Sequence, residues 1–164
     1  MNINDKIKAI NEQESRLVFD KFGAKEAWEL GKVIVAQAEL LGVSPAISIR
    51  NTTGYPVFQY GFEGTGLEHE AWIERKENTA IYKGMSTMKV HLLEEESNID
   101  IVNDWFMDPM TYSTCPGAFP IRVKNAGIVG TIIVSGISVL MDHNLIVNAL
   151  CEYLNINDIT QIEE

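Results

Sequence analysis

The amino-acid sequence predicts an α+β domain in which helices cover a central antiparallel sheet. Two pairs of β-rich segments are each joined by a short turn, which is the pattern of antiparallel hairpins, and apolar residues at helical spacing flank both pairs. The chain has 164 residues, with no internal repeat and no linker rich in Pro, Gly or Ser. One domain over residues 1–164 is therefore expected, with a short N-terminal helix over residues 1–14 and a C-terminal tail over residues 155–164.

The N-terminal part of the chain is expected to be helical. Isoleucines at positions 3, 7 and 10 recur at helical spacing among charged residues, which predicts the short first helix. A longer apolar stripe runs from Ala24 to Leu41 and predicts a second helix. Gly42 is expected to end this helix, because glycine adopts the left-handed cap conformation at little cost. Between these two helices, residues 17–19 are a candidate for a short strand.

The first hairpin is expected between residues 46 and 60. Two β-rich runs, 46–50 and 55–60, are separated by Asn-Thr-Thr-Gly at residues 51–54, which favours a turn. Pro56 cannot donate to a strand ladder, so we expect it at a sheet edge or at a bulge.

Helical patterns return after a glycine loop at residues 61–66. One predicted helix covers residues 67–82 and ends at Gly84, and a second, shorter helix covers residues 88–95. Farther along, residues 115–120 (Cys-Pro-Gly-Ala-Phe-Pro) form a rigid segment, because each proline fixes its own φ angle and restricts the residue before it.

The second hairpin joins residues 121–124 to residues 128–135. Gly130 lies inside the second of these runs and Gly136 directly follows it. Glycine weakens a strand, so its presence there predicts a place where another backbone or a ligand approaches closely.

A final helix is expected to begin at Asp142, whose carboxylate would cap it by accepting from unpaired backbone N–H groups. His143 follows in the first turn, where the positive end of the helix dipole favours a neutral imidazole ring. The apolar face of this helix contains Leu145, Ile146, Ala149, Leu150, Tyr153 and Leu154.

The composition of the chain excludes several classes of partner. Thirteen basic and 23 acidic residues give a formal net charge of −10, which opposes binding to nucleic acid or anionic lipid, since both need clustered Lys and Arg. The longest apolar tract, residues 127–141, is shorter than the roughly 20 residues of a membrane-spanning helix. With two cysteines and no apolar signal-peptide core, a reducing, cytoplasmic location is expected.

Candidate catalytic and metal-ligating residues are few. His69, His91 and His143 are far apart, and no second histidine follows His69 at the metalloprotease spacing, so no metal site is predicted. Cys115 lies in the rigid segment, but no histidine is near it in the sequence. Because the spacing assembles no nucleophile, base and orienting group, an enzymatic activity is neither assigned nor excluded.

The placement of positive charge is more informative. Arg75 and Lys76 occur on one predicted helix, whereas Arg122 and Lys124 alternate out of a strand and share one of its faces. If the helix packs over that face, Arg75 and Arg122 would converge on a carboxylate or phosphate, which guanidinium binds through two hydrogen bonds. The alternative is a set of ion pairs with the abundant Glu and Asp residues of the same chain.

Four stretches follow one another in the order of a known family. They are residues 72–78 (Trp-Ile-Glu-Arg-Lys-Glu-Asn), residues 117–123 (Gly-Ala-Phe-Pro-Ile-Arg-Val), the glycine-containing run 127–136, and Asp142-His143. Together they resemble the haem-degrading-domain family of GlcG/HbpS-like proteins, most closely its uncharacterised branch, over about residues 22–154. The resemblance implies a profilin-like fold with a central antiparallel sheet between helices, and assembly into dimers or larger rings.

The resemblance also implies a set of site residues. Some relatives in the family bind haem or iron, whereas the branch that this sequence resembles most has no settled activity. The ligand-binding positions carried over from the family pattern are Trp72, Arg75, Lys76, Asn78, Phe119, Arg122, Ser135 and His143. Gly117, Pro120 and Asp142 are further positions of that pattern.

The first predicted function is that of an oligomeric ligand-binding domain. Its pocket would lie between residues 72–78, residues 117–121 and residues 135–143, and its ligand would be small and anionic, with haem as one candidate. In this hypothesis Arg75 and Arg122 hold carboxylates of the ligand. Phe119 and Trp72 supply flat apolar walls, and His143 ligates iron or polarises the ligand. The alternative is a non-enzymatic assembly protein whose family motifs serve the interface between subunits.

Overall fold

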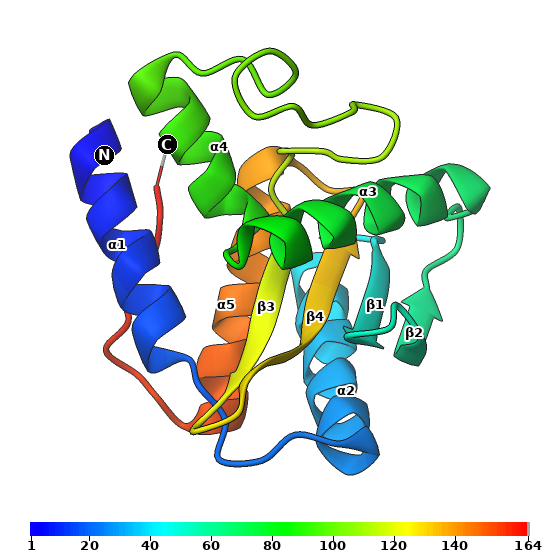
Figure 1. Ribbon diagram of the computed structural model, residues 1–164. Coiled ribbons are helices and arrows are strands. Elements are labelled where there is room, and N and C mark those ends of the chain that lie inside the picture. Colours follow the sequence, from blue (N-terminus) through cyan, green and yellow to red (C-terminus); the bar gives the residue numbers. More distant parts are fainter. Residues whose placement is uncertain (164) are drawn as a thin grey trace.

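A four-stranded antiparallel sheet with the strand order β2-β1-β4-β3 forms the centre of the protein (Figure 1). The computed structural model describes residues 1–163. The strands are β1 (Ala46–Asn51), β2 (Pro56–Gly61), β3 (Ala118–Val123) and β4 (Gly127–Ser135). Strands β1 and β2 form the first expected hairpin, β3 and β4 form the second, and β1 pairs with β4 in the middle of the sheet.

Helices cover both faces of this sheet. They are α1 (Ile3–Arg16), α2 (Ala24–Leu41), α3 (Leu67–Lys83), α4 (Thr87–Ser97) and α5 (Val139–Leu154). Helices α2 and α5 pack together on one face, and α3 crosses the opposite face (Figure 1). The predicted α+β class, an antiparallel sheet flanked by helices, is confirmed.

The alternation of side chains along each strand decides which layer a residue joins. In β1, Ile47 and Ile49 enter the main core beneath α2 and α5, whereas Ser48 and Arg50 face α3. The apolar contact between the sheet and α3 is correspondingly small, and it consists of Ala46, Ile73, Ala80, Ala118 and Ile133. The α3 side of the sheet therefore has room for buried polar groups.

Helix α1, helix α4 and the C-terminal segment form a third layer beside β3 (Figure 1). Ile10, Leu92 and Ile162 pack together there, one from each of the three segments. Gln13 Nε2 donates to the backbone oxygen of Thr160 over 2.7 Å, which attaches the C-terminal segment to α1. The expected tail, residues 155–164, thus packs onto the fold over its described part, which ends at residue 163.

Two expectations about local structure are wrong. Helix α5 begins at Val139 and is capped by Ser138, whose hydroxyl accepts from Met141 N over 3.3 Å, so Asp142 lies inside the first turn and is not the cap. Residues 17–19 form no named strand, because Phe19 makes only an isolated parallel bridge with Val123. Pro56, by contrast, lies on the edge strand β2 opposite a register shift in β1, as its missing N–H predicts.

Gly130 confirms the expectation of a close backbone approach. It lies in β4 opposite Asn51, and a Cβ added at this position would lie 2.3 Å from the backbone oxygen of Arg50. The two central strands therefore approach too closely at this point for any residue other than glycine.

Replacing this glycine should destabilise the sheet. We expect Gly130→Ala to lower the free energy of unfolding by about 1–3 kcal/mol, because the backbone of β1 must move to make room. Urea unfolding followed by circular dichroism measures the change. Gly66→Ser is the control, since a Cβ at Gly66 meets nothing within 4 Å, and it should stay within about 0.5 kcal/mol of wild type. Equal stability of the two variants would contradict the close approach.

Candidate functional site

A pocket of about 340 Å³ opens between the N-terminal half of α3 and the connection from β4 to α5. Helix α3 contributes Glu68, His69, Trp72 and Lys76, the connection contributes residues 135–139, and Cys115 and Asp142 complete the lining. The volume lies at the lower end of the range of small-molecule pockets. The helix of residues 72–78 and the turn of residues 135–143 meet here, as the first functional hypothesis requires.

A buried ion pair forms one wall of this pocket. Lys76 is only 1% exposed, and its Nζ lies 2.8 Å from Asp142 Oδ2 and 3.0 Å from the backbone oxygen of Val134. The other carboxylate oxygen of Asp142 accepts from the backbone N–H of Ile137 over 3.0 Å. The pair therefore connects α3, the end of β4 and α5 through side chains from opposite faces of the sheet.

Gly117 leaves the space in which the pair forms. Its φ angle is +125°, and a Cβ at this position would lie 2.4 Å from Val134 O and 2.7 Å from Lys76 Nζ. Any other residue would displace the ammonium group from its acceptors. The contact with Lys76 thus explains why a glycine occupies position 117 of the family pattern.

The charges of the pair balance each other inside the protein. Burial raises the pKa of the Asp142 carboxyl, while the Lys76 ammonium and the hydrogen bonds to the carboxylate act in the opposite direction. An ammonium group has three N–H donors, and two of them are directed at Asp142 and Val134. No hydrogen bond among the described residues uses the third N–H of Lys76.

His69, which the sequence analysis considered only as a metal ligand and set aside, lines the pocket. Its Nδ1 accepts the backbone N–H of Gly66 over 3.2 Å at the start of α3, so in the neutral ring the proton resides on Nε2. Cδ2 and Nε2 of the ring lie beside Gly136, where a Cβ would approach them to 3.0 and 3.1 Å. Gly136 therefore lets the donor nitrogen of His69 face the pocket. A histidine at the third position of a helix is a weak signal in the sequence, because many exposed histidines occupy such positions.

Three of the predicted ligand-binding residues line the pocket, and a fourth borders it. Trp72, Lys76 and Ser135 belong to the lining. The guanidinium carbon of Arg75 lies 4.0 Å from the ring centroid of Trp72, and its Nη1 donates to the backbone oxygen of Pro109 over 3.4 Å. Arg75 therefore supports the outer side of the tryptophan.

The structure places the other four predicted residues elsewhere. Asn78 donates to the backbone oxygen of Thr111 over 3.0 Å on a different side of α3, and Arg122 donates to the backbone oxygen of Gly84. Phe119 is part of the main core and packs against His143. Arg75 and Arg122 bind different backbone carbonyls and do not meet at this pocket, because Arg122 lies near the C-terminal end of α3.

His143 is enclosed on the side of α5 that faces α1. It is fully buried, and its Nε2 lies 2.9 Å from Gln13 Oε1, while the Gln13 amide nitrogen is used by Thr160. The imidazole therefore donates from Nε2. Burial lowers the pKa of His143 to about 3, so the ring is neutral, as expected, but it does not reach the pocket.

Cys115 lines the pocket as a protonated thiol. Burial raises its pKa, and the nearby Asp142 adds to this effect while Lys76 opposes it. No group of three or more His, Cys, Asp and Glu side chains within residues 1–163 is placed to hold a metal ion. The arrangement is thus suited to binding an anionic group by Lys76 and His69 more than to nucleophilic attack.

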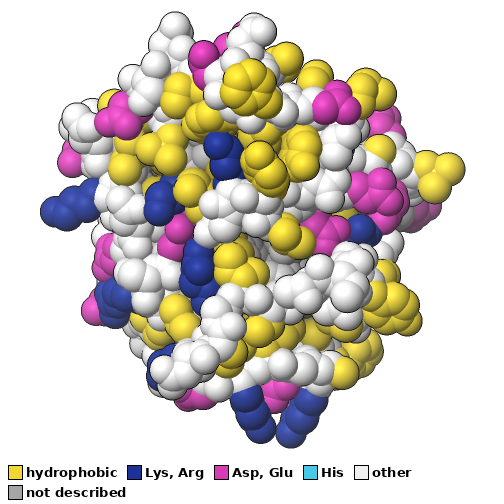
Figure 2. Space-filling model, in the orientation of Figure 1, with side chains coloured by type: hydrophobic (Ala, Val, Ile, Leu, Met, Phe, Trp, Pro, Cys, Tyr) yellow, Lys and Arg dark blue, Asp and Glu magenta, His cyan; other side chains and the backbone are white. Residues whose placement is uncertain are grey.

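The surface around α3 carries mixed charge. Figure 2 shows Lys and Arg side chains scattered among acidic and apolar ones on this face, without a single basic region. None of the helices in the described part of the chain is both long enough and apolar enough to span a membrane.

Comparison with known proteins shows the family. The model of the haem degrading, HbpS-like family matches residues 22–151. A UPF0303 protein of Yersinia enterocolitica is 33% identical over 156 residues, which are 95% of this chain and 92% of that protein. One from Serratia proteamaculans is 34% identical over 157 residues, 96% of this chain and 97% of that protein.

Two solved structures show the same fold. The Ybr137w protein superposes with a TM-score of 0.84 at 23% identity, covering 94% of this chain and 93% of that one. A PduOC:heme complex superposes with a TM-score of 0.67 at 15% identity, covering 87% and 99% of the two chains.

The buried ion pair can be tested by a double-mutant cycle. We expect Lys76→Met or Asp142→Asn alone to cost about 3–5 kcal/mol of unfolding free energy, because each leaves one buried charge without its partner. The double variant should lose clearly less than the sum, since neither charge remains. Urea denaturation of the four proteins measures the coupling, and losses that add to within about 0.5 kcal/mol would show that the two groups do not interact.

Proposed function

Because the chain belongs to the haem degrading, HbpS-like family, we propose that it binds haem, and that the pocket between α3 and the β4–α5 connection takes one edge of the porphyrin. The observation that carries the proposal is Lys76, a fully buried lysine that lines the pocket and has one N–H without an acceptor among the described residues. A propionate carboxylate is the acceptor that would fit it. The fold shared with a PduOC:heme complex supports the same ligand class.

The lining residues fit the chemical groups of haem. Lys76 is the donor for a carboxylate, and Trp72 offers a flat apolar surface held in place by Arg75. A volume of about 340 Å³ would hold part of the macrocycle, with Trp72 among the residues in contact with it. When bound, haem supplies a redox-active iron to the site.

His69 is the one imidazole among the described lining residues, so it is the residue that would hold the haem iron. To ligate through Nε2, the ring would carry its proton on Nδ1 and give up the hydrogen bond from Gly66 N. That bond lies at an exposed helix start, where its loss costs about 1 kcal/mol. His143 does not serve this role in the proposal, because Gln13 and the core enclose it.

The proposal also covers the setting of the protein. We propose that residues 1–164 act as one domain in a reducing, cytoplasmic environment, which the two free cysteines, Cys115 and Cys151, support.

A haemin titration tests the main proposal. Wild type at micromolar concentration should give a saturating shift of the Soret band, and His69→Ala should weaken or remove it. His91→Ala on α4, outside the pocket lining, is the matched control and should bind as wild type does. Trp72→Ala should lower the affinity further than Trp72→Phe, because phenylalanine keeps a flat wall. A spectrum that does not change with wild type, or equal binding by the two histidine variants, would refute this site.

A second candidate function, self-assembly, is favoured by the outer surface of β2 and α2. Trp28 is 58% exposed and Tyr60 is 41% exposed, and with Val35, Val57 and Phe58 they border an apolar hollow of about 430 Å³. Strand β2 is also an edge strand with unpaired backbone groups along its outer side. A second copy of the chain could pair with this edge about a two-fold axis and cover both rings.

Light scattering tests self-assembly. Trp28→Glu combined with Tyr60→Glu should reduce the molar mass in solution, because two charges would be buried in the apolar contact. Met110→Glu, at an apolar position on the loop before β3 that is more exposed than either ring, should leave the mass unchanged. If wild type is a monomer, or if the double variant keeps the assembled mass, this surface is not the interface.

A further inference from the structure

A second pocket of about 350 Å³ lies on the other half of α3, next to the β1–β2 turn. It is bordered by Thr53 and Gly54 of that turn, by Glu77, Asn78 and Tyr82 of α3, and by Tyr112 of the loop before β3. Asn78, one of the residues that the family resemblance marked for ligand binding, thus belongs to this pocket and not to the first one.

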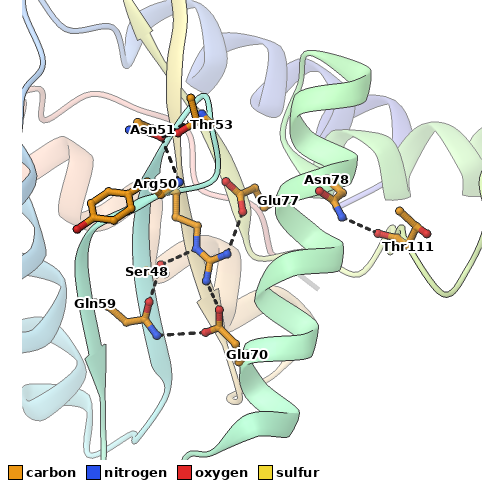
Figure 3. A network of polar contacts seen from close by, with 10 residues as sticks. Ser48, Arg50, Asn51, Thr53, Gln59, Glu70, Glu77, Asn78 and Thr111 are labelled. Carbon is orange, nitrogen blue, oxygen red and sulfur yellow. Dashed lines mark hydrogen bonds and ion pairs between the residues drawn. The ribbon is translucent and has the colours of Figure 1, made fainter.

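A buried network of charges forms the inner side of this pocket (Figure 3). Arg50 of β1 donates from Nε to Ser48 Oγ over 3.0 Å and from Nη1 to Glu77 Oε2 over 3.1 Å, and its Nη2 donates to Glu70 Oε1. Glu70 also accepts from Gln59 Nε2 over 3.1 Å. One guanidinium therefore faces two carboxylates, and the network has an excess of negative charge.

The second carboxylate oxygen of Glu77, Oε1, accepts no hydrogen bond from the described residues. The residue is 4% exposed, and this oxygen is itself buried. Figure 3 shows this oxygen directed away from Arg50, toward the β1–β2 turn. A buried acceptor without a donor is costly, so this oxygen favours any N–H group that can approach it.

The turn above Glu77 places a glycine, and no side chain, next to the carboxylate. Gly54 has a φ angle of +81°, and even an added Cβ there would lie 4.0 Å from both carboxylate oxygens. The turn is held by its own contacts, since Asn51 Oδ1 accepts from the Thr53 N–H and hydroxyl and from Tyr55 N. It covers the carboxylate without donating to it.

The remaining lining suits a positively charged organic group. The ring centroids of Tyr82 and Tyr112, which both line the pocket, lie 5.3 Å apart, and Thr52, Thr53 and Thr111 also belong to the lining. None of the described lining residues is Lys or Arg. Aromatic faces attract cations, so charge and shape favour the same ligand class.

We propose that this pocket is a binding site for a small alkylammonium ion, whose N–H donates to Glu77 Oε1 and whose carbon chain packs against the pair of rings formed by Tyr82 and Tyr112. The carboxylate supplies the charge-assisted hydrogen bond and the rings supply apolar contact. The site lies on a different part of α3 from the haem pocket and does not depend on the proposal made for that pocket.

The environment of Glu77 is consistent with this ligand. Burial raises the pKa of its carboxyl, the Arg50 guanidinium opposes that shift, and the neighbouring Glu70 and Glu74 carboxylates add to it. A second cation next to Oε1 would favour the ionised form, which gives the ligand and the carboxylate a mutual stabilisation.

The test is a titration of the full chain with n-butylammonium chloride, followed by two-dimensional ¹⁵N NMR. Backbone signals of residues 52–54, 77–82 and 111–112 should shift and saturate at millimolar ligand. The uncharged n-butanol and the N–H-free tetramethylammonium ion are matched probes, and both should bind at least about tenfold more weakly. Equal shifts with n-butanol would show an apolar site only.

Variants separate the carboxylate from its surroundings. Glu77→Gln should weaken n-butylammonium about tenfold, whereas Glu74→Gln, the same change at an exposed position on α3, should alter the affinity less than about twofold. Tyr82→Ala should weaken binding and Tyr82→Phe should retain it. The tyrosine variants keep the test decisive even if Glu77→Gln unfolds, because Tyr82 is largely exposed.

Two further outcomes would overturn the proposal. One is the absence of saturable shifts at residues 52–54 and 77–82 with n-butylammonium. The other is binding by Glu77→Gln, or by Tyr82→Ala, that equals binding by wild type.

Discussion

The ion pair between Lys76 and Asp142 is the contact on which the candidate site depends. It joins a helix on one face of the sheet to a helix on the other, just beyond the end of β4. Two buried charges cost several kcal/mol each unless they are paired and hydrogen-bonded, so this contact determines how α3 and α5 are placed relative to each other. The pocket lies where the two helices meet, and its one buried cation is a member of the pair.

Glycines make the close contacts around this pair possible. Gly117 leaves space for the ammonium group, Gly136 lets the His69 ring approach the β4–α5 connection, and Gly130 lets the two central strands approach each other. Glycine destabilises the segment that contains it. In each of these three cases the group that requires the glycine lies far away in the sequence. The two glycines at the pocket therefore belong to the structure of the site and are not simply turn residues.

Helix α3 carries both candidate sites because the sheet face beneath it is only partly apolar. Its first half presents Trp72 and Lys76 to the β4–α5 connection, and its second half presents Glu77 to Arg50 and the β1–β2 turn. Successive residues of a helix point about 100° apart, so Lys76 and Glu77 are directed to different surroundings. One helix thus places a cation at one pocket and an anion at another.

Local patterns in the sequence determined the two hairpins, the main helices and the family. Turn residues and periodicity act over a few positions, so they can be recognised without coordinates. Only the tertiary structure decided which polar groups meet. Lys76 and Asp142 are 66 positions apart, and His143, adjacent to Asp142, points to Gln13 on the opposite side of α5. The direction of a side chain depends on how helices pack, and no spacing along the chain encodes that arrangement.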